Sequence, residues 1–444
     1  MKATRRWASF AVIAVLSLFV LTAGNVRAQD TGAAPTKAPG QPYTMAEYNA
    51  YQAAASEKNA ATQIKELDDF VAKYPNSALL NYIYPLYYRN YGQQKNFPKT
   101  IEYADKQIAL SAATPGEKYD AYTVRAFAFN NTQNPDPATA KAAYNAALEG
   151  AKIVPNVPKP EGVSDADFAK QKSDSIAMFN GTAGNAAMAA KDYPAAVAAL
   201  KTVLGTNPDD FLTNFFLGKA YSAMTPPQQL DAMWYYGRAA GAKNATAQQS
   251  TQIKTYLRKL LANYQGGTVC DAVTDAEFNE LLQLAATSIE RPATYKPYSA
   301  ADLDAARKDM TIASVVTDLK AGGDKAKLTW TASCGLEFPD VPGKIMEVTP
   351  GDPVAMKTAF VTSEAEFEAA TTPNMEVKIS GQPEAAKLEV GNSVRFTGTL
   401  ETYDPDPNFM LHWDKAKVNA EDLPKEKGAP KKPAAHKPAP KKKP

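Results

Sequence analysis

The amino-acid sequence predicts a mainly α-helical protein: an α-solenoid of helical hairpins, followed by a small β-barrel and a disordered tail. Apolar residues recur at helical spacing through residues 44–265. From residue 323 the apolar period falls toward two, which is typical of strands. The 444 residues include only two histidines and two cysteines. A site built on a histidine base or a His/Cys metal cage needs more of these residues, so composition indicates a protein that is no enzyme and uses no metal or cofactor.

Residues 1–28 have the pattern of a cleaved signal peptide. Three cations precede an apolar run over residues 11–21, and Val26 and Ala28 occupy the −3 and −1 positions of a signal peptidase site. The run is shorter than the ~20 residues that span a bilayer, which argues against a membrane anchor. No cysteine forms a lipobox there. We therefore expect Sec-type export, a periplasmic or secreted protein without a transmembrane segment in its mature chain, and a flexible leader over residues 29–43.

The clearest helical repeat lies between residues 192 and 221. Its first helix carries small and large residues on one face and ends at a proline: Ala196, Leu200, Val203 and Pro208. The next helix carries Leu217, Gly218 and Tyr221. Small residues let paired helices approach closely while large residues fill the space opposite. The pattern resembles the tetratricopeptide repeat (TPR) family, whose helices A and B pair in this way.

The same helix-A and helix-B spacing, followed along the chain, predicts about five repeats within residues 44–265, several of them degenerate. Gly184 takes the helix-A glycine position, and helix-B patterns recur at Leu67, Phe70 and Pro75, at Phe97, Thr100 and Ala104, at Ala140, Tyr144 and Ala147, and at Ala232, Tyr236 and Ala239. Residues 246–264 read as a capping helix. Pro85 predicts a helix that starts there or kinks.

The TPR resemblance implies a concave groove, lined by helix A, that binds an extended peptide or a partner's helix. By phase, the candidate groove residues are Tyr82, Arg89, Tyr122, Arg125, Phe129, Asn185, Phe215 and Lys219. Aromatic rings beside cations suit a peptide that carries acidic side chains or a C-terminal carboxylate. The alternative is that the rings form core between helices and the cations a solvated face.

Residues 266–322 predict a helical linker, and residues 323–420 a β domain. Helices are expected over 275–289 and 299–319. Strands are expected over 327–331, 343–349, 375–380, 393–400 and 409–413. Short strands separated by Gly/Pro turns favour a small barrel.

The β domain resembles the oligonucleotide/oligosaccharide-binding (OB) fold found at the end of exported bacterial TPR proteins of unassigned function. The likeness lies in Pro342-Gly343-Lys344, in the glycine-containing strand from Val394 to Leu400, and in the turn that starts at Tyr403. Readers of nucleic acid on this fold stack bases on exposed aromatics. Trp330, Phe396 and Trp413 are the aromatic candidates, with barrel core as the alternative. The many carboxylates between them would repel phosphates and disfavour nucleic acid.

Cys270 and Cys334 are the only cysteines, 64 residues apart. In an oxidising compartment they suggest one disulfide between the end of the repeats and the β domain. Closing this loop would stabilise the fold by about 4 kcal/mol on the chain-entropy model. Two free thiols, or pairing between molecules, remain the alternatives.

Charge is distributed unevenly along the chain. The formal net charge is +2, yet four cations in residues 1–28 and seven lysines in residues 427–444 leave nine net negative charges on residues 29–426. The tail over residues 421–444 is rich in Lys, Pro and Ala and predicts disorder. Such a tail either contacts anionic lipid or polysaccharide weakly, or only keeps the protein soluble.

These patterns together favour a non-enzymatic scaffold of the cell envelope. In this hypothesis the groove binds a protein or peptide, the barrel is an accessory module, and the basic tail contacts an anionic surface. The alternative hypothesis is an oligosaccharide- or nucleic-acid-binding protein that acts through the OB-like domain and the tail.

Overall fold

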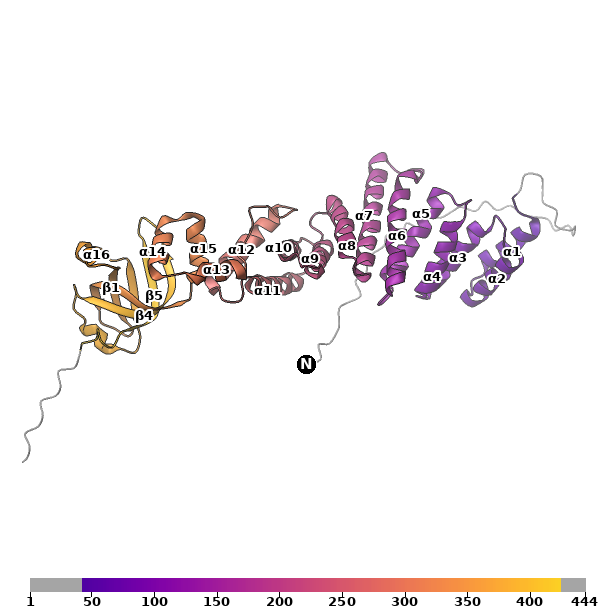
Figure 1. The fold of residues 1–444 in the computed structure, drawn as a ribbon. Coiled ribbons are helices and arrows are strands. Elements are labelled where there is room, and N and C mark those ends of the chain that lie inside the picture. Colours follow the sequence, from indigo (N-terminus) through magenta and orange to yellow (C-terminus); the bar gives the residue numbers. More distant parts are fainter. Residues whose placement is uncertain (1–41, 425–444) are drawn as a thin grey trace, which may run out of the picture. The chain divides into compact units, whose positions relative to one another are not determined.

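The computed structural model describes residues 42–424 (Figure 1). The predicted signal peptide, all but the end of the leader and nearly all of the predicted tail lie outside the described residues. The chain divides into two compact units, Met1–Tyr87 and Tyr88–Pro444, and each is described here by itself.

The first unit contains α1 (Met45–Ser56), α2 (Ala60–Lys73) and the beginning of α3 (Leu80–Gln93). Thr44 and Asn59 cap the first two helices. The buried residues of the unit include Leu67 and Phe70, as the helix-B pattern predicts. Helix α3 begins at Leu80 and continues through Pro85, so the proline does not start this helix.

The second unit continues the helical array. Its helices are α4 (Phe97–Ala109), α5 (Pro115–Asn130), α6 (Pro137–Ile153), α7 (Asp165–Ala189), α8 (Tyr193–Thr206), α9 (Phe211–Ala223), α10 (Gln229–Gly241), α11 (Ala247–Tyr264) and α12 (Asp271–Thr287). Helices adjacent in sequence pack on one another from α4 to α12, and α10 also packs on α12 (Figure 1). A short 3-10 turn, η1 (Val154–Asn156), follows α6. This arrangement confirms the predicted mainly helical, TPR-like class.

Glycines stand where the helices approach most closely. A Cβ at Gly184 would lie 2.5 Å from Leu200, and one at Gly218 would lie 2.8 Å from the ring of Tyr236. Both contacts join the helix-A glycine to the large helix-B residue, which confirms the small–large pairing predicted from the sequence.

Arg238 of α10 binds the chain around it although its side chain is buried. It donates hydrogen bonds to the carbonyls of Pro208, Ala285 and Ser288, and to Oδ1 of Asn214 at 3.1 Å. Burial lowers the pKa of Arg238. These bonds attach α12, which lies in the predicted linker, to the last repeat helices, and its Leu281 and Ala285 share their core.

The next three helices are α13 (Ala300–Lys308), α14 (Ile312–Ala321) and α15 (Gly323–Ser333). The strand expected over residues 327–331 is wrong, because these residues lie inside α15. Ala326, Thr329 and Ser333 are buried at helical spacing on one face, and this stripe outweighs the short alternation of polar and apolar residues that suggested a strand.

The barrel comprises β1 (Glu337–Thr349), β2 (Val354–Phe360), β3 (Met375–Ile379), β4 (Ser393–Asp404) and β5 (Met410–Val418). It closes in the order β1-β2-β3-β5-β4, with β3 and β5 parallel and the other neighbours antiparallel. The helix α16 (Glu364–Ala369) and the 3-10 turn η2 (Pro383–Lys387) lie in its connections. A small barrel is thus confirmed with four of the predicted strands, and β2 was missed.

The aromatic side chains of the barrel fill its interior. Phe396 and Trp413 are almost completely buried and meet edge to face at 5.5 Å, and Phe338 contacts the same indole. The core alternative is therefore right for Phe396 and Trp413, which cannot stack on a base. Trp330 is half-buried and packs on Tyr403.

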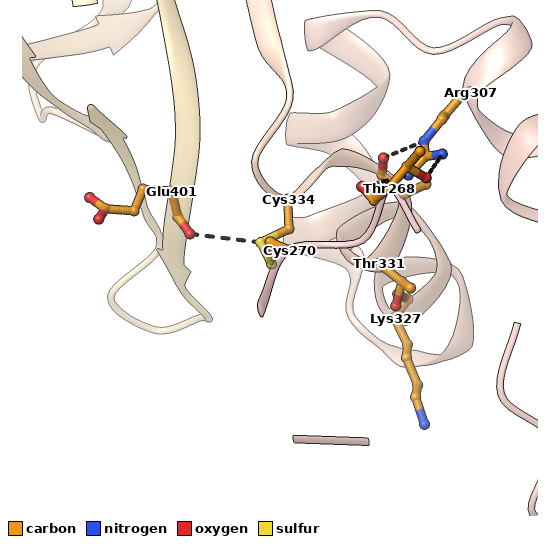
Figure 2. The surroundings of a disulfide bond; sticks show 8 residues. Thr268, Cys270, Arg307, Lys327, Thr331, Cys334 and Glu401 are labelled. Carbon is orange, nitrogen blue, oxygen red and sulfur yellow. Dashed lines mark hydrogen bonds between the residues drawn. A yellow bond between two sulfur atoms is a disulfide. The ribbon is translucent and has the colours of Figure 1, made fainter. Parts of the chain in front are cut away.

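A disulfide joins Cys270, directly before α12, to Cys334, directly after α15 (Figure 2). Their Cα atoms are 5.7 Å apart. The backbone N–H of Gly335 then donates to the carbonyl of Leu400 in β4 at 2.8 Å. The predicted pair thus links the end of the helical array to the entry of the barrel. Within residues 42–424, no helix combines the length and apolar character that crossing a membrane requires.

Candidate peptide-binding surface

The eight candidate groove residues lie on four helices: α3, α5, α7 and α9. Tyr82 belongs to the first unit, where its ring is 50% exposed and 6.0 Å from that of Tyr51. Arg89, in the second unit, is exposed. Burial raises the pKa of Asp120, and the charge of Arg89 offsets part of that rise.

Two of the three candidate groove residues on α5, Arg125 and Phe129, are buried. Phe129 is only 4% exposed and packs on Ala140, Ala143 and Ala186, so it is core and not a groove residue. Arg125 is also buried, and its Nε lies 2.5 Å from Oδ1 of Asp105. This guanidinium is engaged within the fold because α4 supplies its carboxylate.

Two further candidates are partly accessible. Tyr122 is half-buried against the cluster around Phe179, and burial raises its pKa. Asn185 on α7 is half-buried, and its Nδ2 donates weakly to Oδ1 of Asn130 at 3.4 Å. Asn185 thus retains a side-chain carbonyl that can accept a hydrogen bond from a peptide N–H.

Helix α9 places a cation against aromatic rings. Lys219 is exposed, and its Nζ lies 5.8 Å from the ring centre of Phe215 and 5.5 Å from that of Phe216. The two rings are themselves half-buried and 5.8 Å apart. Within the part of the chain that the structure describes, no carboxylate pairs with Lys219. Two of the candidate groove residues, Phe215 and Lys219, thus lie together on α9, and Phe216, which is not among those candidates, lies beside them.

An exposed tyrosine on α11 extends the aromatic contacts. The ring of Phe215 lies 5.9 Å from that of Tyr236, which meets Tyr256 edge to face at 5.2 Å. Tyr236 is buried, which raises its pKa to about 12, whereas Tyr256 is 48% exposed. Tyr256 is not among the candidate groove residues, because it lies outside the buried stripe of α11 formed by Ile253, Leu257 and Leu261. Its position off that stripe is the signal that could have identified it.

We call Phe215, Phe216, Lys219 and Tyr256 the α9–α11 surface. It combines apolar ring faces with one unpaired cation. Such a set can bind an extended chain through its side chains and hold one carboxylate by a charge-assisted hydrogen bond.

The outer face of the barrel has a different chemistry. Glu347 Oε2 lies 2.9 Å from Lys357 Nζ, and Lys357 is the cross-strand neighbour of Glu376. His412 lies between two carboxylates, with Nδ1 2.9 Å from Glu376 and Nε2 2.9 Å from Asp404. We call these five residues the charged row of the barrel. Along the row, Lys357 and His412 each lie beside carboxylates, so both side chains already have acidic partners.

Among the described residues, no three His, Cys, Asp or Glu side chains converge to hold a metal ion. Around His412, each ring nitrogen contacts a different carboxylate, so the three groups pair with one another.

Three solved structures are similar to parts of this chain. PilW, described as a widely conserved type IV pilus biogenesis factor, is 14% identical over 54% of this chain and 93% of its own, with a TM-score of 0.28. TTC0263, a TPR protein of Thermus thermophilus, is 12% identical over 48% and 98%, with a TM-score of 0.24. The TPR2AB domain of yeast Sti1, in a pHSP90 complex, is 13% identical over 55% and 96%, with a TM-score of 0.17.

No protein-family model matches the sequence, and neither does any of the curated proteins. In this chain, successive helices pack on one another, and helix-A glycines at Gly184 and Gly218 contact large helix-B side chains. The helical part of the chain is a TPR-like repeat array.

Proposed function

We propose that the protein is a non-enzymatic scaffold of the cell envelope that binds a protein or peptide on its helical array. The proposal places an extended peptide on the α9–α11 surface. The observation that carries it is Lys219, an exposed cation that contacts two phenyl rings and has no carboxylate partner in the described part of the chain.

The chemistry of the surface favours a ligand that carries a carboxylate. Some lysines of the array have acidic partners: Lys201 Nζ lies 3.0 Å from Glu290, and Lys106 lies 2.8 Å from Glu102. The cation of Lys219 lacks such a partner, and the apolar rings beside it reduce its access to water. An acidic side chain or a C-terminal carboxylate would complete this site.

The aromatic residues favour an extended ligand over a single ion. Phe215, Phe216 and Tyr256 provide ring faces on α9 and α11. The buried ring of Tyr236 contacts both Phe215 and Tyr256. Aromatic rings provide a large contact area for little loss of side-chain entropy. Asn185 on α7 adds a group that can bond to a peptide backbone.

The envelope location is supported by two features of different kind. The first 28 residues have the signal-peptide pattern, and the two cysteines are joined in a disulfide, a bond that persists in oxidising compartments. In the same proposal the barrel is an accessory module, and the basic tail contacts anionic lipid or polysaccharide.

An array of synthetic acidic decapeptides tests the binding proposal. Each peptide is presented with a free C-terminus, with an amidated C-terminus, and with its acids replaced by amides. We expect the full chain to bind a subset of the acidic peptides, and Lys219→Gln to weaken that binding by roughly tenfold, the effect of losing one charge-assisted bond. Tyr256→Ala should weaken the same peptides.

Lys141 provides the matched control, because it is also an exposed lysine of the array, on α6. Lys141→Gln removes the same charge and should leave binding unchanged. Equal losses in the two lysine variants would show that net charge, not the α9–α11 surface, attracts the peptides. Binding that is insensitive to both Lys219→Gln and Tyr256→Ala would reject the proposed surface.

A further inference from the structure

The two sulfurs of the disulfide have different surroundings. Cys334 is only 1% exposed, whereas Cys270 is half-buried. Cys270 also lines an open cleft of about 300 Å³, whose other walls include Gly335, Thr399 and Asp414. Of the two cysteines, Cys270 is therefore the more accessible to a thiol from outside.

Cys270 stands at the N-cap of α12, a helix of 17 residues. Its side chain makes no capping hydrogen bond. The positive end of the helix dipole would stabilise a Cys270 thiolate, which favours the release of Cys270 in the last step of reduction, when a mixed disulfide at this sulfur is resolved. The two carboxylates of the first turns, Asp271 and Asp275, are paired with Arg258 at 2.7 and 2.6 Å, which reduces their repulsion of a thiolate.

Cys334 has an acceptor for a proton once the bond is open. Its Sγ lies 3.8 Å from the backbone carbonyl of Glu401 (Figure 2). A thiol at Cys334 can donate to this oxygen, so the buried sulfur would remain stable as S–H.

The junction has a second link that does not depend on the disulfide. Arg307 Nη1 donates to Oγ1 of Thr268 at 2.6 Å, and its Nε donates to the carbonyl of Ala332 at 2.8 Å (Figure 2). These bonds span the same two segments as the disulfide. The segments can therefore stay together when the sulfurs separate.

We propose that Cys270–Cys334 is an exchangeable disulfide, which a dithiol reduces in the folded protein by attack at the sulfur of Cys270. A thiolate of the dithiol attacks Cys270 Sγ, forms a mixed disulfide and releases Cys334 as a thiolate, which takes up a proton. The second thiol of the dithiol, after losing its proton, attacks its own half of the mixed disulfide and releases Cys270. The dithiol leaves as a cyclic or internal disulfide, and the protein keeps two reduced cysteines.

Single-cysteine variants of the full chain test the direction of attack. In Cys334→Ala only Cys270 remains, and in Cys270→Ala only Cys334 remains. We expect the Cys270 thiol to react with an aromatic disulfide such as dithiobis(nitrobenzoate) at least roughly tenfold faster than the Cys334 thiol. Equal rates, or faster reaction at Cys334, would overturn the proposal.

The unmodified protein provides a test that does not depend on how the variants fold. Reduction by dithiothreitol is followed in native buffer by alkylation and mass spectrometry, while circular dichroism records the helix content. We expect reduction faster than global unfolding, with the helix signal unchanged. Reduction that occurs only at the rate of unfolding would show that the disulfide is purely structural, and the proposal would be wrong.

Discussion

Lys219 of the helical array and the charged row of the barrel have different electrostatic surroundings. On α9 the ammonium group of Lys219 lies against two phenyl rings and has no acidic partner within the described residues. On the barrel, Lys357 and His412 lie between carboxylates of the charged row. Paired surface charges contribute little attraction for an outside ligand, because a ligand must first displace the internal partner. The difference is consistent with the proposal that a partner binds on the array.

The hydrophobic cores of the two regions are also formed by separate sets of side chains. The barrel core is formed around Trp413, Phe396 and Leu400, whereas the array around α10 packs through Trp234, Tyr235 and Tyr236. These two clusters share no residue. A substitution in one core should therefore destabilise that region and leave the other region folded. The predictions below test this separation and the difference in charge.

Trp413→Ala should have the largest effect. Its indole is almost completely buried between Phe338 and Phe396, and removing such a side chain costs about 3–5 kcal/mol of folding free energy. Hydrogen exchange should show the strands β1–β5 losing protection while α8–α10 keep theirs. Parallel loss of protection in α8–α10 would show that the cores unfold as one unit, and the comparison of two regions would fail.

The strands and the repeats could be predicted because their patterns are local. Ala196, Leu200 and Gly218 follow one helix period, and four strands alternate clearly. The strand β2, Val354–Phe360, was missed because its Ala, Met and Thr residues give little contrast between faces. The segment 327–331 alternates but lies in a helix, since a buried face made with Ala326 and Ser333 decides its conformation.

The surroundings of the candidate groove residues could be predicted less well, because they depend on distant partners. Arg125 fits the groove phase, yet Asp105 of the preceding helix binds it. Phe129 fits the same phase but packs on Ala186, 57 positions later in the chain. A single sequence shows neither contact. Phe215 and Lys219 do lie together, as expected for residues one turn apart on one helix.

Gly218→Ala should have the next largest effect, and its sign should differ from that of a matched glycine. A Cβ at Gly218 would lie 2.8 Å from Tyr236, so we expect a loss of about 1–3 kcal/mol of stability from overpacking. Gly181, inside α7, has no atom within 4 Å of such a Cβ. Gly181→Ala should therefore stabilise the helix by about 0.5–1 kcal/mol.

Urea unfolding followed by the helix signal measures both glycine variants. Gly218→Ala should also weaken peptide binding, because Tyr236 supports Phe215 and Tyr256. Equal stabilisation by the two alanines would show that α9 and α10 do not approach as closely as described.

Glu277→Gln should have a smaller effect that depends on pH. Burial raises the pKa of Glu277, and the hydrogen bond from Gln265 at 2.6 Å only partly offsets this rise. The folded protein therefore keeps this proton to a higher pH than the unfolded chain, and stability falls as the pH rises above the ordinary value of 4.5. Glu277→Gln removes this loss, so it should be more stable than wild type at pH 7.5.

The advantage of Glu277→Gln should shrink below pH 4.5, where both states of the wild type are protonated. Urea midpoints at pH 4 and pH 7.5 measure it. Glu280→Gln, one turn away at an exposed position, should show no comparable gain at pH 7.5. A Glu277→Gln variant less stable than wild type at pH 7.5 would mean that the carboxylate is needed in the core.

The smallest expected effect concerns the charged row of the barrel and uses a chain that ends at residue 424, without the lysine-rich tail. This chain should not bind a labelled single-stranded oligonucleotide at 100 mM salt (roughly 10 Å Debye length). Replacing Glu347 and Glu376 by lysine leaves Lys357 without these carboxylates and should create weak, salt-sensitive binding. Fluorescence anisotropy at two salt concentrations measures it.

Glu364 and Glu389 are exposed acids outside the charged row, and their replacement by lysine changes the net charge equally. If this control binds as strongly as the row variant, net charge alone governs attraction, and pairing within the row does not explain the barrel's behaviour. If the chain with an intact row already binds, the barrel is itself a nucleic-acid module, since neutralised cations would then suffice for contact. Weak binding by the row variant alone would establish that the barrel's carboxylates, rather than its fold, keep polyanions away.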